Sequence, residues 1–239
     1  AISSFALAHE GIYDVKVSNS AGTLYSDTVL LIPKPTANNN VAVYDFAGTT
    51  RDTAKWGAND FNEGAGRFAQ NGKLFYYTQG TVSGEDLAAR GWHTQALPYN
   101  KDWSAQVDVN VPNLTMSSNN MIATGLYIFN QDDHGDSTQL SLYRDSGSRK
   151  FEAIMDVNGN ELPDATSATT STTATVRLRW VASEKKLYYE YDANGATGGY
   201  SWTALTSKVL NTGSTNWEMN ANSSFVIALV TESENMTIT

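Results

Sequence analysis

Polar and aromatic side chains recur at every second position of several short runs, in a pattern that suits sugar recognition. Sugar rings present flat C–H faces to aromatic rings, and their hydroxyl groups need amide or carboxylate partners. Tyr127 is the most informative, because Leu126 and Ile128 fall on the opposite side of its run. For the aromatic candidates, packing within the protein is the competing interpretation. The candidate carbohydrate-binding residues are Trp92, Gln106, Asp108, Tyr127, Gln139 and Tyr143.

Three carboxylates lie close together in the segment Gln131-Asp-Asp-His-Gly-Asp136. Carboxylate oxygens in a loop are typical ligands of Ca²⁺. We therefore name Asp132, Asp133 and Asp136 as candidate ligands of a structural calcium ion, with an exposed acidic turn as the alternative. No other cofactor is expected.

Residue groupings that support catalysis are sparse. His9, His93 and His134 are scattered, and neither a Gly-x-Ser-x-Gly motif nor a Walker-type loop occurs. Glycoside hydrolysis needs two carboxyl groups at a fixed separation across the scissile bond. Asp108 together with Glu152 or Glu190 from neighbouring strands is the pair that the sequence leaves open.

Alternating apolar and polar residues predict the strands that must position these side chains. In Trp103–Val111 the odd positions are apolar and the even positions are polar, as in a strand with one buried face. The runs Met121–Asn130, Thr138–Arg144 and Lys150–Met155 follow with short turns between them. We expect four consecutive strands in one antiparallel meander, with the candidate residues on its solvated face.

The rest of the chain predicts more strands and no helix of convincing length. Asn71-Gly72 lies between two strand-like runs and is a strong hairpin signal. Further strands are expected at 41–46, 88–97, 174–181, 186–192, 200–205, 224–230 and 236–239, and residues 156–173 are expected to form a turn and a loop. About a dozen strands with so little helix predict an all-β fold, an antiparallel sandwich of two sheets.

Composition argues against several classes of partner. The formal net charge is -9, so the chain repels phosphate backbones and anionic membranes, and we expect no nucleic acid partner. No run approaches the roughly 20 apolar residues that span a bilayer, so no membrane insertion is expected. The sequence contains no Cys, which excludes disulfides and thiolate chemistry. It shows no signal peptide, and we interpret it as a fragment of a longer polypeptide with additional domains.

Residues 1–33 resemble the C-terminal strands of an immunoglobulin-like domain. Gly11 and Tyr13 fit its tyrosine corner, and Val15 stands where the second Cys would be. Residues 34–40, with a proline on each side of Lys34, are expected to be a linker. Residues 41–239 then form a second domain.

The second domain resembles bacterial concanavalin A-like lectin/glucanase domains, which have the jelly-roll fold. The resemblance rests on the hairpin Arg177–Gly195, on Ser201-Trp-Thr-Ala-Leu205, and on the opening Asp45-Phe46 with Trp56. It implies glycan binding outside the cell or at the bacterial cell surface. Glucanases of this fold carry Glu-x-Asp-x-x-Glu on a strand, whereas Gln106–Val111 offers Asp108 alone.

The sequence therefore predicts a non-catalytic polysaccharide-binding module of a secreted or surface multidomain protein. Two alternatives stay open. One is a structural or adhesive spacer without a ligand, and the other is a glycoside-active enzyme with an unrecognised carboxylate pair.

Overall fold

The computed structural model describes residues 46–92, 97–195, 197 and 199–239, together with the backbone of four short N-terminal strands. These strands are β1 (Gly11–Tyr13), β2 (Lys16–Asn19), β3 (Gly22–Tyr25) and β4 (Val29–Leu31). β1 pairs with β4 and β2 pairs with β3, both antiparallel. His9, Val15, the linker 34–40, most of the strand expected at 41–46, and His93 lie outside the described residues. The immunoglobulin-like resemblance and the domain boundaries stay predictions.

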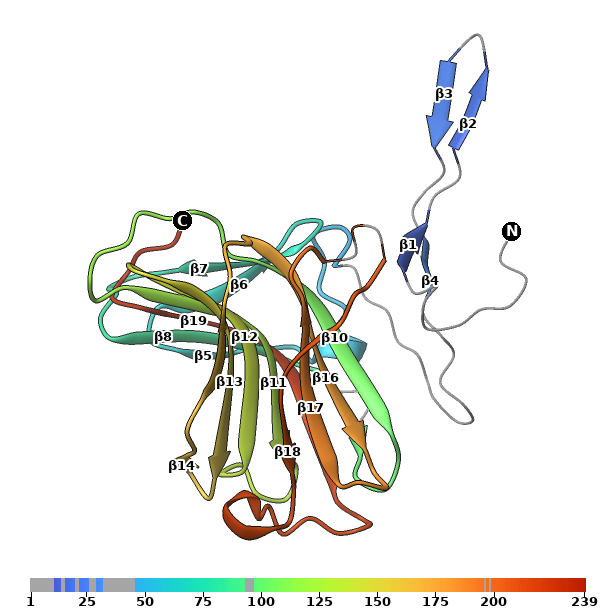
Figure 1. Cartoon of the computed structure of the whole chain (residues 1–239). Coiled ribbons are helices and arrows are strands. Elements are labelled where there is room, and N and C mark those ends of the chain that lie inside the picture. The colour runs from blue at the N-terminus through green and yellow to red at the C-terminus, as the bar shows by residue number, and fades with distance from the viewer. Residues whose placement is uncertain are drawn as a thin grey trace.

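Two antiparallel sheets form the body of the molecule (Figure 1). The large sheet contains, in spatial order, β14 (Asn160–Glu161), β13 (Arg149–Val157), β12 (Ser137–Asp145), β11 (Met121–Asn130), β19 (Ser224–Glu234), β8 (Glu85–Gly91) and β5 (Phe61–Glu63), with β15 (Ala165–Ala168) beside β13 and β9 (Leu97–Pro98) beside β19. The small sheet contains β10 (Trp103–Asn110), β16 (Thr173–Val181), β17 (Lys186–Asp192) and β18 (Thr203–Val209).

The remaining elements are short. β6 (Gly66–Gln70) and β7 (Leu74–Thr78) form the hairpin expected around Asn71-Gly72. The helical segments of the described chain are α1 (Thr53–Trp56) and a 3₁₀ turn at Gly213–Thr215. The expectation of an all-β, two-sheet sandwich is confirmed.

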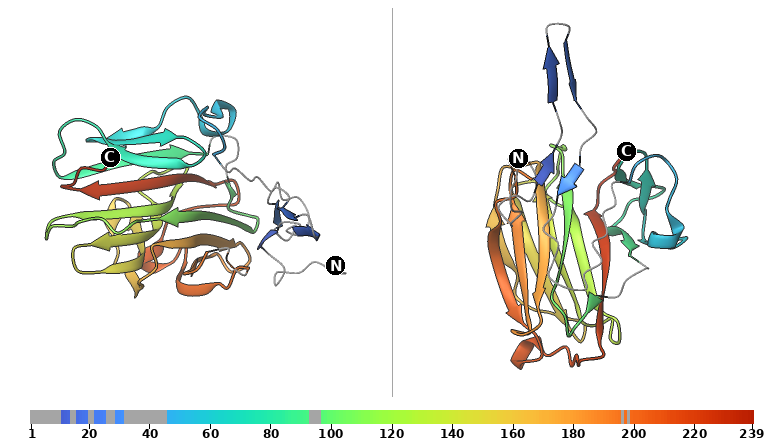
Figure 2. Two further views of the ribbon diagram at one scale, coloured as in Figure 1. Left: turned by 90° about the horizontal axis from the view of Figure 1, so that it is seen from above. Right: turned by 90° about the vertical axis from the view of Figure 1, so that its right-hand side faces the viewer.

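The core fills the space between the two sheets, which appear as separate layers in side view (Figure 2). Phe225 of the large sheet packs against Trp103 and Trp180 of the small sheet, with ring centroids 5.2 Å apart in both pairs. Strand alternation delivers Ile128 and Leu140 from the large sheet to this interior, where both are fully buried. Burying these apolar side chains is the main stabilising contribution.

The predicted four-strand meander is wrong in one strand. β11, β12 and β13 are consecutive neighbours, but β10 pairs along its whole length with β16, from Trp103 opposite Trp180 to Asn110 opposite Thr173. The alternation in β10 specifies one buried face, which either sheet can supply. Residues 111–120 then carry the chain from the small sheet to the large one.

Two smaller differences concern the C-terminal half. β19 continues to Glu234, four residues past the predicted end, and the strand expected at 236–239 does not form. The segment 156–173 contains the short strands β14 and β15, which pair with β13. β14 and β15 extend the large sheet beyond β13.

A buried hydrogen bond joins the two sheets inside the core. The hydroxyl groups of Thr138 and Tyr189 lie 2.7 Å apart, and Thr138 also donates to the carbonyl of Ile154. Because Tyr189 is fully buried, its hydroxyl has no access to water.

We expect Thr138→Val to destabilise the protein more than Tyr189→Phe does. The first change strands a buried hydroxyl at a cost of about 1–3 kcal/mol, whereas the second leaves Thr138 bonded to Ile154 and costs about 1 kcal/mol. Urea unfolding of both variants measures the difference. Equal losses, or a larger loss in Tyr189→Phe, would contradict this account.

Candidate functional site

The candidate site lies on the side of the large sheet that faces away from the small sheet, which we call the outer face. On β11, Leu126 and Ile128 point into the core, so Ala123, Gly125 and Tyr127 point outward. The register carries this alternation to the neighbouring strands. Ala123 lies between Tyr143 on β12 and Glu232 on β19.

A row of small residues crosses the outer face. Ala89 of β8, Val230 of β19, Gly125 of β11 and Ser141 of β12 stand opposite one another in register. The rows on either side carry longer side chains. One contains Leu87, Glu232, Ala123, Tyr143 and Lys150, and the other contains Ala228, Tyr127, Gln139 and Ile154.

Gly125 cannot be replaced without moving the backbone. A Cβ atom there would lie 2.0 Å from the carbonyl oxygen of Leu140 and 2.8 Å from the Cα of Ser141. The strands approach each other so closely at this point that only glycine fits. The space above Gly125 is therefore left to side chains from its neighbours.

Gln139 and Glu232 meet across this position. They come from the two strands that flank β11, and the Gln139 amide Nε2 donates to Glu232 Oε1 at 3.0 Å. Burial is the largest cause that raises the pKa of Glu232 to about 7; the nearby carboxylates of Glu85, Glu152 and Glu161 also raise it, and the Gln139 hydrogen bond lowers it. Glu232 thus exchanges a proton near neutral pH.

Lys150 connects two further members of the site. Its ammonium lies 2.6 Å from Glu152 Oε1 and 4.3 Å from the centre of the Tyr143 ring. The first contact is a salt bridge, and the second is a cation–π interaction. Burial, with the carboxylates of Asp145 and Glu152, raises the pKa of Tyr143 to about 12, so its hydroxyl keeps its proton.

The Ser141 hydroxyl is an unpaired polar group in this face. Ser141 is fully buried, and its oxygen has no hydrogen-bond partner among the described residues. Its neighbours in the core, Leu140 and Leu142, point the other way, so Ser141 points outward. A buried hydroxyl without a partner costs free energy that a bound ligand could recover.

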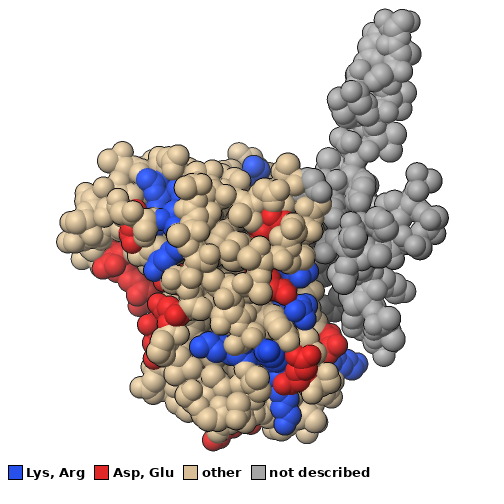
Figure 3. Space-filling model, in the orientation of Figure 1, with Lys and Arg blue, Asp and Glu red and all other residues tan. Residues whose placement is uncertain are grey.

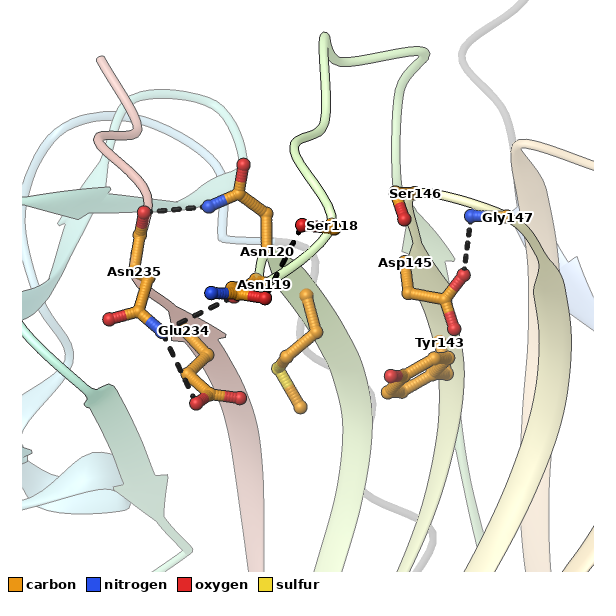
Figure 4. A pocket seen from close by; sticks show the side chains of 10 residues that line it. Ser118, Asn119, Asn120, Tyr143, Asp145, Ser146, Gly147, Glu234 and Asn235 are labelled. Carbon is orange, nitrogen blue, oxygen red and sulfur yellow. Dashed lines mark hydrogen bonds between the residues drawn. The ribbon is translucent and has the colours of Figure 1, made fainter.

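A pocket of about 570 Å³ lies at one end of the outer face (Figure 4). Tyr143, Asp145 and Glu234 belong to strands β12 and β19, while Asn119 and Asn120 come from the loop before β11. The Asn120 amide donates to the backbone oxygen of Asn235 at 2.7 Å, which ties this loop to the end of β19. The pocket thus lies next to the row that contains Tyr143 and Glu232, toward the end of the sheet.

Three of the six predicted binding residues come together on the outer face: Tyr127, Gln139 and Tyr143. Both tyrosines are partly exposed. Trp92 lies on the opposite side of the large sheet, because its amide bonds to Ile227, and its ring packs edge-on against Trp56 at 4.7 Å.

Gln106 and Asp108 lie on the small sheet, since β10 belongs to it. Asp108 accepts a hydrogen bond from the Thr175 hydroxyl, and it faces away from the large sheet. It therefore cannot pair with Glu152. Glu190 is bound by the guanidinium groups of Arg177 and Arg179, each at 2.8 Å.

Glu232 and Gly125 are among the site residues that sequence reasoning missed. The predicted strand stopped at Val230, although the outward positions Val226, Ala228 and Val230 lead by the same alternation to Glu232. A glycine within the strand-like run Met121–Asn130 was the available sign of a close backbone approach.

The three acidic residues of the predicted calcium loop do not converge on one point. Asp136 is buried and accepts hydrogen bonds from the Asn158 amide at 3.0 Å and the Asn130 side chain at 3.4 Å. Asp133 accepts from the Gly135 amide at 2.9 Å. No group of three His, Asp or Glu side chains suited to a metal ion occurs within the described residues. Asp133 and Asp136 thus stabilise the loop itself.

Comparisons with known proteins relate this chain to others through its fold. No protein-family model and no curated protein sequence matches it. The endo-1,3-beta-glucanase from Streptomyces sioyaensis superposes with a TM-score of 0.55 at 16% identity, covering 84% of this chain and 87% of that one. Peanut lectin superposes with a TM-score of 0.45 at 10% identity, covering 80% and 97%. The fold is a concanavalin A-like jelly-roll sandwich.

Within the described residues, no helix is long and apolar enough to span a membrane.

The pKa of Glu232 predicts a pH-dependent stability. Because the folded-state pKa of about 7 exceeds the ordinary 4.5, the folded state holds the extra proton between these values, and the stability falls as pH rises through them. We expect the free energy of unfolding of Glu232→Gln, relative to that of the wild type, to increase by up to about 3 kcal/mol as pH rises from about 4 to about 8. Urea unfolding across this range measures it, with Glu234→Gln as the exposed control on the same strand. A difference that does not vary with pH would refute it.

The closed hydrogen bonding of the Asp132–Asp136 loop predicts that calcium does not stabilise it. We expect the same melting temperature with excess calcium and with chelator, because Asp133 and Asp136 already accept backbone hydrogen bonds. Thermal unfolding measures this. A calcium-dependent increase that disappears in Asp132→Asn would restore the calcium site.

Proposed function

We propose that this chain binds polysaccharide through the outer face of the large sheet without cleaving it. The observation that carries the proposal is the convergence on this face of two partly exposed tyrosines, an amide and two carboxylates around the small-residue row. Tyr127 and Tyr143 offer ring faces for stacking on sugar C–H groups. Gln139, Glu152 and Glu232 offer the donors and acceptors that sugar hydroxyls require.

The dimensions of the face suit an extended ligand. The small-residue row runs from Ser141 on β12 to Ala89 on β8, and Phe61, which is 64% exposed, stands next in register on β5. Four strand spacings separate β12 from β5, which is about 19 Å at about 4.8 Å each. Such a length accommodates several sugar units.

The cellular setting is part of the proposal. We place the chain outside the bacterial cell or at its surface, within a longer multidomain polypeptide, as its resemblance to lectin/glucanase domains implies. The structural neighbour is named as an endo-1,3-beta-glucanase, so 1,3-β-glucan is the first polysaccharide to test.

Glycoside hydrolysis is the second candidate, because Glu232 has the pKa that suits a general acid. Its partner would be Glu152, which lies three strands away, about 14 Å between backbones. Two side chains that reach toward each other shorten this gap toward the roughly 6.5–9.5 Å of inverting enzymes. However, Glu232 accepts a hydrogen bond from Gln139, and Glu152 forms an ion pair with Lys150. Because both carboxyl groups already have partners, we favour binding over hydrolysis.

We expect Tyr127→Ala and Tyr143→Ala each to weaken polysaccharide retention by about tenfold, the loss of one stacking contact. Affinity electrophoresis on a panel of polysaccharides measures this. Tyr188→Ala is the matched control, since Tyr188 is a partly exposed tyrosine on the small sheet. Unchanged retention in both variants would refute the proposal. Release of reducing ends that Glu232→Gln abolishes would replace it with hydrolysis.

A further inference from the structure

The charge of the outer face is strongly unbalanced. Its acidic residues, assigned by strand register, are Glu63, Glu85, Asp145, Glu152, Asp156, Glu161, Glu232 and Glu234. These are eight of the 25 acidic residues of the chain, whereas one of its 16 Lys and Arg residues, Lys150, shares the face within the described strands. Figure 3 shows acidic residues gathered in a band that runs from the β8 edge of the large sheet down beside β13 and β14.

Neighbouring carboxylates contribute to the raised pKa values of Glu85, Glu161 and Glu232. Burial raises the pKa of Glu85, and Glu63 and Glu234 raise it further. Burial likewise raises the pKa of Glu161, with Asp164 and Asp156 adding to it. The face therefore holds repulsion that a cation would relieve. Lys150 relieves part of it through its contact with Glu152.

The buried Ser141 hydroxyl independently indicates a ligand. It lies in the small-residue row beside Gly125, and Gln139 and Glu232 meet above that row. It has no partner among the described residues. A ligand group that replaces Gln139 as the partner of the Glu232 carboxylate and also hydrogen-bonds to this hydroxyl would satisfy both groups. An ammonium group can donate to both oxygens.

We propose that the polysaccharide bound here is a cationic one, a chain of amino sugars whose free amino groups are protonated. This inference rests on the proposed function. The protonated amine would pair with a carboxylate, while the sugar ring that carries it would stack on a neighbouring tyrosine ring. A uronic acid polymer would be repelled by the same carboxylates. A divalent metal ion is a weaker fit, because the described acids form no three-ligand cluster.

Binding of the amine at Glu232 has a further consequence. A cation beside the carboxylate lowers its pKa from about 7, so binding below this pH releases a proton. The binding heat then depends on the ionisation enthalpy of the buffer.

Calorimetry with three matched oligosaccharides tests the inference: a glucosamine oligomer, its N-acetylated counterpart and a neutral glucan oligomer of equal length. At mildly acidic pH and low salt, we expect the glucosamine oligomer to bind at least about tenfold more tightly than the other two, the contribution of one charge-assisted contact. Added salt should reduce this preference. Proton release should appear as a difference between two buffers.

Glu232→Gln should remove the preference and the proton release together. Asp108→Asn, which removes a carboxylate from the small sheet, is the matched control and should change neither. If all three oligomers bind equally and Glu232→Gln has no effect, the inference fails while the proposed function stands. If no oligomer binds, both fail. If a lysine-rich peptide of similar charge binds as tightly as the glucosamine oligomer, the face attracts cations in general and the inference is overturned.

Discussion

The burial of one face of the large sheet against the small sheet is the constraint on which the rest of this structure depends. Phe225 packs against Trp103 and Trp180, and the other strands of both sheets supply aliphatic side chains to the same interior. Since side chains alternate along a strand, each residue fixed in the core fixes the outward direction of its neighbours. Leu126 and Ile128 in this way determine that Gly125 and Tyr127 face outward.

The outer face combines features that a purely structural surface would not need. Gly125 has no side chain on this face, and a hydrogen bond between an amide and a carboxylate of raised pKa joins the two strands that flank it. A buried hydroxyl lies beside it without a partner. Unsatisfied polar groups and crowded like charges both cost stability, and such groups are enriched at functional sites.

Much of the fold could be predicted from local patterns. β11 and β17 match their predicted limits, because each is a continuous strand-like run between turn-forming residues. The hairpin at Asn71-Gly72 follows from turn chemistry. The candidate site was predicted in part: Tyr127, Gln139 and Tyr143 share a face because β11 and β12 are joined by a short turn, which leaves little freedom in their pairing.

The sequence alone determined which residues alternate, where the chain turns, and that the product is an all-β sandwich. Only the tertiary structure decided which sheet each strand joins. β10, like β11, buries one face, yet it lies in the other layer and takes Gln106 and Asp108 away from the outer face. Glu232, more than 90 residues from Gln139, meets it because β19 inserts between β8 and β11. The physical reason is that alternation specifies a buried side, whereas the choice of partner depends on how distant strands share one core.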